Sequence, residues 1–159
     1  MPASMSTEII LSRLRKFYLG FSAFIFAGSL FELTVLNHTG QPVQLLPFIL
    51  GAVGLLLVAW AFFRPGMAGL RLLRVSMALI TLGSLVGVYF HLRGNLEAVL
   101  DSGASLTLFQ QVVRTLGGEN PLMAPGILAI AAVLAIAATY GQKALASEGN
   151  RVAVSAAAD

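Results

Sequence analysis

Both histidines of this sequence and a glutamate near each have the types from which metal or proton sites are built. The chain holds two histidines, His38 and His91, and carries Glu32 and Glu97 within six positions of them. Imidazole and carboxylate groups bind zinc or copper, and they also relay protons. These types support the hypothesis of one site made by His91, Glu32, His38 and Glu97. A divalent metal is the cofactor that this hypothesis implies.

Structural roles account for the same part of the sequence. Asn95 after Gly94 has the residue types of a helix N-cap that follows a glycine C-cap, with Glu97 in the next first turn. Arg93 and Glu97 are four positions apart, which is the spacing of an ion pair on an exposed helix face. His91 suits a hydrogen bond to a neighbouring carbonyl. From sequence, the ligand and the structural interpretations both stay open.

The sequence lacks the signatures of common catalytic sites. There is no HExxH, GxSxG, Walker A or dinucleotide-binding motif, and no cysteine for a redox pair. Bis-histidine haem ligation would need His38 and His91 at one depth on facing helices, but His38 stands in a turn beside Gly40. An enzyme is therefore not the favoured class. A membrane enzyme acting on a lipid or quinone is kept as a third hypothesis.

The composition indicates that lipid surrounds much of the chain. The sequence is 57% hydrophobic and 11% charged, with a mean hydropathy of +0.85. Soluble domains are roughly 45–50% apolar and about 25% charged. The lysines and arginines flank apolar segments instead of forming a basic stripe, so the net charge of +3 does not indicate nucleic acid. The lipid bilayer is the expected partner.

Four apolar runs predict four transmembrane helices. They cover residues 17–36, 45–63, 72–92 and 124–140. At about 1.5 Å per residue, about twenty residues cross a hydrocarbon layer of about 30 Å. The basic residues before the first run also resemble the start of a signal peptide. That run exceeds the usual apolar length of roughly 7–15 residues, so we interpret it as a retained anchor.

The segment between the third and fourth runs predicts a helix of another kind. Apolar residues recur at helical spacing over about residues 105–116, and Gly117-Gly118 ends the pattern. We expect an amphipathic helix in the outer loop, lying in the interface or capping the bundle. The predicted fold is all-α, an integral membrane four-helix bundle over residues 1–141. Residues 142–159 are predicted to be a disordered cytoplasmic tail.

The basic residues indicate how the chain is oriented. If the N-terminus is cytoplasmic, the inner side receives eight lysines and arginines and the outer side two. The positive-inside rule then predicts a multi-pass inner (plasma) membrane protein with both termini cytoplasmic. The inner set is Arg13, Arg15, Lys16, Arg64, Arg71, Arg74, Lys143 and Arg151, and the outer set is Arg93 and Arg114.

Small residues in the predicted spans favour close helix contacts. Gly83 and Gly87 form a GxxxG motif in the third run, and Gly51 and Gly54 lie in the second. Membrane helices associate through such residues because lipid tails compete for apolar side chains but not for close backbone approach. The same faces suit intramolecular packing, a homo-oligomer or a membrane protein partner.

The least generic part of the chain is Gly87-Val-Tyr-Phe-His91-Leu-Arg-Gly-Asn95-Leu-Glu97. In this segment and in its overall architecture, the chain resembles small uncharacterised bacterial four-helix inner-membrane proteins. The resemblance implies the fold and the membrane, and it carries no activity.

These observations favour a non-catalytic membrane protein. We expect an accessory, scaffold or assembly protein that acts through helix packing and its outer loop. The alternative is a small metal- or proton-handling membrane protein that uses the His91, Glu32, His38 and Glu97 site at the outer face. Convergence of Glu32, His38 and His91 within a few ångströms would favour the alternative.

Overall fold

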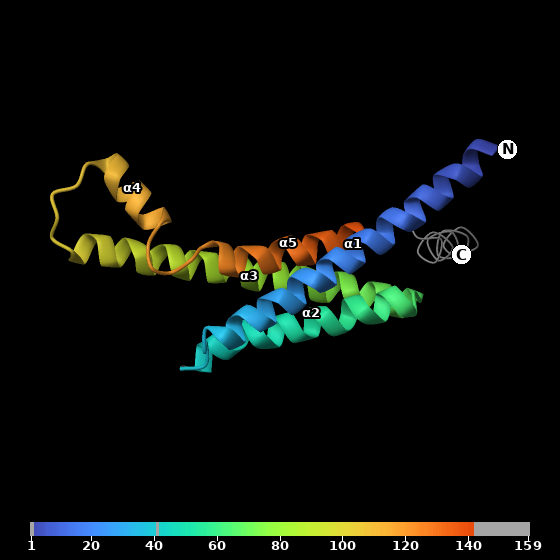
Figure 1. Ribbon diagram of the computed structural model, residues 1–159, viewed down its shortest axis with the longest axis horizontal. Coiled ribbons are helices and arrows are strands. Elements are labelled where there is room, and N and C mark those ends of the chain that lie inside the picture. Colours follow the sequence, from blue (N-terminus) through green and yellow to red (C-terminus); the bar gives the residue numbers. More distant parts are fainter. Residues whose placement is uncertain (1, 41, 142–159) are drawn as a thin grey trace, which may run out of the picture.

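The computed structural model describes residues 2–40 and 42–141, and every regular element within them is helical. The elements are α1 (Pro2–Val35), the short 3-10 helix η1 (Pro42–Leu45), α2 (Leu46–Phe63), α3 (Met67–Asp101), α4 (Leu108–Leu116) and α5 (Met123–Ala137) (Figure 1). The predicted all-α class is therefore confirmed. The predicted tail at residues 142–159 lies outside the described residues.

Two helices are longer than the apolar runs that predicted them. α1 begins at Pro2 and not near residue 17, because proline is tolerated in a first helical turn and no further proline follows before residue 42. α3 covers Met67–Asp101 and so continues well past residue 92. The other helices, α2, α4 and α5, start within three residues of the predicted positions.

The helix break suggested at Gly94 and Asn95 is wrong. α3 passes through both residues, so Asn95 is not an N-cap but an interior residue of a long helix. A single glycine inside a helix costs only about 1 kcal/mol relative to alanine. The Asn95 side chain is buried and hydrogen-bonded to residues 115 and 120, which removes its competition with the helix backbone.

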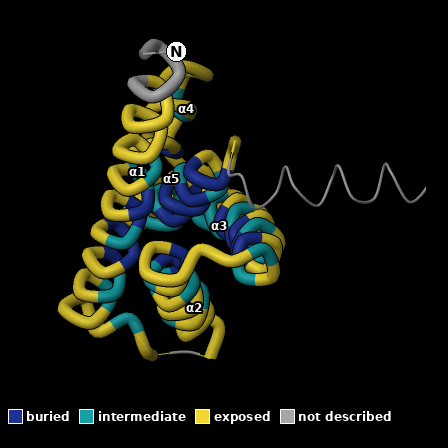
Figure 2. The backbone as a smooth tube through the Cα atoms, turned by 90° about the vertical axis from the view of Figure 1, so that its right-hand side faces the viewer, coloured by how far each residue is buried: buried dark blue, intermediate teal, exposed yellow. Residues whose placement is uncertain are grey.

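α1, α2, α3 and α5 pack around a shared core. α1 packs against α2 and α5, and α3 packs against the same two helices, so α1 and α3 are not close neighbours. Figure 2 shows buried residues facing the centre of this arrangement and exposed residues on its outward faces. α4 packs on α3, beside the part of that helix that projects beyond the others (Figure 1).

Each of the four glycines predicted to lie at helix contacts faces another helix. The pairs are Gly51 with Leu30, Gly54 with Phe26, Gly83 with Leu50, and Gly87 with Pro125. The closest is Gly54, where an added Cβ would lie 2.6 Å from the fully buried ring of Phe26. These glycines therefore set the spacing between helices of this chain.

The surface of the packed helices is strongly apolar. Exposed side chains on α1 include Phe17, Phe24 and Phe31, and Leu56 and Leu79 are exposed on α2 and α3. Such a continuous apolar surface is not stable in water. α1, α2 and α3 are long and apolar enough to cross a membrane, whereas α5 is apolar but has 15 residues.

One end of the packed helices is rich in arginine, and we call it the arginine end (Arg15, Arg64 and Arg74). Arg15 of α1 donates to the carbonyls of Tyr140 and Gly141. Arg74 of α3 donates to the Thr139 hydroxyl at 2.6 Å and to its carbonyl at 3.3 Å. Two guanidinium groups thus bind the unpaired carbonyls after α5, where the helix dipole is negative.

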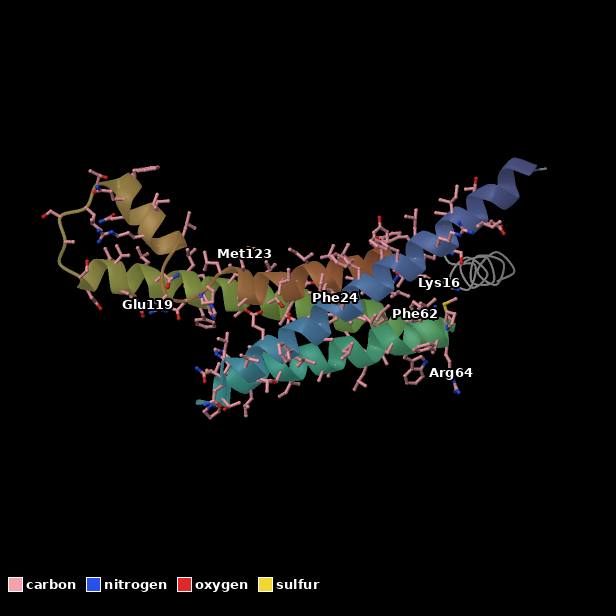
Figure 3. All side chains as sticks on the ribbon, viewed as in Figure 1. Lys16, Phe24, Phe62, Arg64, Glu119 and Met123 are labelled. Atoms are coloured by element: carbon pink, nitrogen blue, oxygen red, sulfur yellow. The ribbon has the colours of Figure 1, made fainter. Side chains whose placement is uncertain are left out.

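The opposite end holds the connecting turns, residues 36–40 with the adjoining η1 and residues 117–122, and we call it the loop end. Figure 3 shows Lys16 and Arg64 toward the arginine end and Glu119 toward the loop end. All four residues proposed from sequence as a metal or proton site lie at or beyond the loop end. The candidate site is therefore built there.

Candidate functional site at the loop end

The loop between α4 and α5 is fixed to α3 by Asn95. The Asn95 amide nitrogen donates to the carbonyls of Thr115 at 3.0 Å and Asn120 at 2.9 Å. Its oxygen accepts from the backbone and side-chain nitrogens of Asn120 at 2.9 and 3.0 Å. Asn95 is 2% exposed, and each of its amide hydrogens and oxygen lone pairs has a partner.

Gly118 makes this contact sterically possible. A Cβ at residue 118 would lie 2.4 Å from Cγ of Asn95, a separation that side chains do not adopt. The loop backbone therefore lies directly against the buried amide. Sequence reasoning missed this relationship, and its only signal was the Gly117-Gly118-Glu-Asn120-Pro121 run of turn-forming residues.

His91 binds the same loop one helical turn before Asn95. Its Nδ1 lies 2.9 Å from the carbonyl oxygen of Pro121. A carbonyl only accepts, so Nδ1 carries the hydrogen in this bond and Nε2 of the neutral ring is left as an acceptor. The structural role predicted for His91, a hydrogen bond to a carbonyl, is confirmed. His91 also lines the cavity described next.

A cavity of about 310 Å³ lies between the helices at the loop end. It is lined by residues of α1, α2, α3 and α5 and of both connecting turns. Its polar lining side chains are Ser29, Glu32, His38, His91, Glu119 and Asn120. The structure thus brings Glu32, His38 and His91 to one cavity although they come from three segments. Glu119 joins them and was not singled out from sequence, because it lies in a turn without periodicity.

Glu97 is not part of this cavity. Its carboxylate accepts from Nε of Arg93 at 2.7 Å, and both side chains are exposed. This is the exposed i,i+4 pair expected as the structural alternative, and solvent screens its attraction. Within residues 2–40 and 42–141, no group of three or more His, Asp or Glu side chains is placed to hold a metal ion.

A second cavity, of about 520 Å³, adjoins the first between α2 and α3. It extends from His38 and His91 toward Gly83 and Ser84, deeper between the helices. The small residues Gly83, Ser84 and Gly87 line it on the α3 side, so part of this space exists because α3 carries no large side chains there. Most of its other lining residues are apolar.

Ser84 is a buried hydroxyl without a hydrogen-bond partner. It is 2% exposed and lines the second cavity. Two other hydroxyls in these helices are paired: Ser22 donates to Ala131 O at 2.7 Å, and Thr81 donates to Met77 O at 2.8 Å. The buried hydroxyl of Thr115 on α4 also has no partner, but it lines neither cavity. An unpaired buried hydroxyl costs about 1–3 kcal/mol, so the deep end of this cavity has an unused polar group.

The charge of the cavity lining is one-sided. Glu32 and Glu119 line the first cavity, and neither cavity is lined by a lysine or arginine. Arg93, the basic residue nearest in sequence to His91, pairs with Glu97. The polar side chains that line the first cavity are therefore two carboxyl groups, two imidazoles, one amide and one hydroxyl.

Comparison with protein-family models, with curated proteins and with solved structures finds no match for this chain.

Proposed function

We propose that this chain is an integral membrane four-helix bundle with four spans, and that it serves as a non-catalytic accessory or scaffold protein. Its outer part would bind a protein in the same membrane. The distance between the arginine end and the loop end supports the membrane topology. The fixed position of α4 supports the scaffold role.

The two polar ends of the packed helices are separated by about one membrane thickness. Arg15 and Glu32 on α1 are 17 positions apart, and so are Arg74 and His91 on α3. At about 1.5 Å per residue both separations are about 26 Å, close to a hydrocarbon layer of about 30 Å. No Asp, Glu, Lys or Arg occurs in residues 17–31, 46–63, 75–90 or 122–140. This uncharged zone is the proposed membrane-embedded part.

α5 spans this zone despite its 15 residues. Leu122 and Ala138, which flank it, have helical dihedral angles, so the helical path covers 17 residues and about 26 Å. Its beginning is next to the Pro121 carbonyl that binds His91, and its end is held by Arg15 and Arg74. α5 therefore extends from the loop end to the arginine end, which supports its assignment as the fourth span.

The charge distribution supports an orientation with the arginine end in the cytoplasm. The sequence places eight lysines and arginines on that side and two on the other, which favours cytoplasmic N- and C-termini in an inner (plasma) membrane. The loop end then faces outward. Two of the eight, Lys143 and Arg151, lie outside the described residues.

The scaffold role rests on one observation, the fixed position of α4 in an outer lobe. We call residues 92–121 the α4 lobe. α3 projects into this lobe, and Asn95 and Gly118 fix the returning loop to it. α4 exposes an apolar face in this fixed position, formed by Leu108, Phe109, Val112, Val113 and Leu116. A fixed, exposed apolar helix face is typical of helix-mediated protein contacts.

The experiment places a photo-crosslinking amino acid at Phe109 in native membranes, with Phe24 as the matched control. Phe109 is 77% exposed on α4, and Phe24 is 72% exposed in the middle of α1. We expect a protein adduct of one defined mass at residue 109 and lipid adducts at residue 24. The exposed apolar-to-polar variant V112N should abolish the adduct at residue 109. Lipid adducts at both positions would show that α4 is a membrane-surface helix and refute the scaffold role.

A further inference from the structure

The two cavities at the loop end share one boundary and can hold one ligand. Both are lined by His38, Pro47, His91, Asn120, Pro125 and Leu128. Their volumes, about 310 and about 520 Å³, each lie within the roughly 300–1,000 Å³ of small-molecule sites. One cavity contains the polar groups and the other is mainly apolar. Such a division matches an amphiphile, with its head in the first cavity and its chain in the second.

We propose that these cavities form a binding site for an amphiphile with an ammonium head, supplied either by a bilayer lipid or by a free alkylamine. This site is independent of the partner proposed for the α4 lobe. The head would lie among Glu32, His91 and Glu119, and the chain would extend along α3 to Ser84.

The head group is assigned by the hydrogen-bonding character of the first cavity. An ionised carboxyl group accepts hydrogen bonds only, which applies to Glu32 and Glu119, and Nε2 of His91 is the nitrogen left to accept when Nδ1 donates to Pro121. The Asn120 side-chain nitrogen already donates to Asn95. An ammonium group has three donors and a positive charge, so it complements this lining. An anionic head would face two carboxylates and no arginine or lysine.

The chain position is assigned by the second cavity. Apolar side chains of α2 and α3 line it, among them Leu46, Leu50, Val86 and Phe90. Ser84 is seven positions from His91, which corresponds to about 10 Å along α3. Its unpaired hydroxyl is the second observation that points to a ligand. A hydroxyl or carbonyl along the ligand chain completes its hydrogen bond.

The test uses the absence of cysteine from the chain. Ser84→Cys places a single thiol in the second cavity, and Ser22→Cys places one in the packed core between α1 and α5 as the matched control. The purified full chain is placed in phosphatidylglycerol nanodiscs and treated with N-ethylmaleimide. Modification is followed by mass spectrometry, and unfolding temperatures confirm that both variants are folded.

We expect the thiol at residue 84 to react about tenfold faster than the thiol at residue 22, because thiol modification needs access. Dodecylamine should slow the reaction at residue 84, and dodecanoate at the same mole fraction should not. Dodecylamine should protect the thiol at residue 84 more strongly than dodecanol does. The double variant E32Q/E119Q should remove this difference. Similar slow reaction of both thiols, or equal protection by dodecanoate, would overturn the proposal.

A further arm distinguishes the two sources of such a ligand. Half of the phosphatidylglycerol is replaced by phosphatidylethanolamine, whose head also carries an ammonium group. Protection of the thiol at residue 84 would assign the site to a bilayer lipid or its single-chain derivative. Unchanged reactivity, with protection by dodecylamine retained, would assign it to a free single-chain amine. If neither phosphatidylethanolamine nor dodecylamine protects the thiol at residue 84, the proposed site is contradicted.

Discussion

Asn95 and Asn120 bind each other through side chain and backbone across 25 positions of sequence. Asn95 is buried inside α3, and Asn120 lies in the turn before α5. This relationship explains why α3 continues past Gly94, why α4 has a fixed position, and why the loop end has a defined cavity. It also provides the first prediction.

Replacing Asn95 with alanine should destabilise the α4 lobe. The change leaves the Asn120 donors and the Thr115 carbonyl without their partner, at a cost of at least about 2 kcal/mol. The expected result is a lower unfolding temperature in nanodiscs and faster proteolysis within residues 102–122. The exposed Glu97→Ala on the same helix is the control and should leave the unfolding temperature almost unchanged. Equal effects of both variants would contradict this role for Asn95.

Adjacent glycines allow a second test of the same contact. Gly118→Ala should destabilise the lobe strongly, because its Cβ would lie 2.4 Å from Asn95 Cγ. Gly117→Ala should have little effect, because its Cβ would meet the Val113 carbonyl at an ordinary 3.4 Å. Proteolysis of the lobe measures both. If the two variants behave alike, the loop does not lie against Asn95 as described.

Gly54 sets the distance between α1 and α2. Gly54→Ala should destabilise the protein by about 1–3 kcal/mol, because the new methyl group would overlap the buried Phe26 ring. Gly28→Ala is the matched control, since nothing lies within 4 Å of its added Cβ and helix propensity favours alanine. Reversible unfolding in mixed micelles measures both. Comparable stability of the two variants would show that Gly54 is not at a close helix contact.

Replacement of Ser84 and of Ser22 with alanine should change the stability of the protein in opposite directions. In the protein without a bound amphiphile, Ser84→Ala removes an unpaired buried hydroxyl and should raise stability by up to about 1 kcal/mol. Ser22→Ala removes the bond to Ala131 O and should lower it by about 1 kcal/mol. A loss of stability in Ser84→Ala similar to that of Ser22→Ala would mean that Ser84 has a structural partner.

Much of the fold follows from local features of the sequence. The α2 range was predicted because eighteen uncharged apolar residues lie between a proline-containing turn and Arg64-Pro65-Gly66. The length of α3 was not predicted, since Gly94 and Asn95 have cap residue types and their partner, Asn120, is distant in sequence. Only the tertiary contact decides between a cap and a buried amide.

The candidate site was predictable only in part, because some of its residues are defined by tertiary contacts. Alternating helix directions place Glu32, His38 and His91 at one end of the chain's fold, as expected from sequence. Glu97 instead follows the local i,i+4 rule and pairs with Arg93. Glu119 and the unpaired Ser84 could not be found, because their roles depend on a loop position and on space between helices.

Membrane topology tests the central proposal of four spans most directly, and the absence of cysteine makes the measurement simple. Ser12→Cys on the arginine side and Ser105→Cys in the α3–α4 loop are each treated in intact cells with a membrane-impermeant thiol reagent, and a reporter is fused after residue 159. The proposal predicts labelling at residue 105, labelling at residue 12 only after permeabilisation, and a reporter active in the cytoplasm. A reporter outside the cell, with residue 12 still protected, would show that α5 does not cross as proposed and would contradict the four-span bundle.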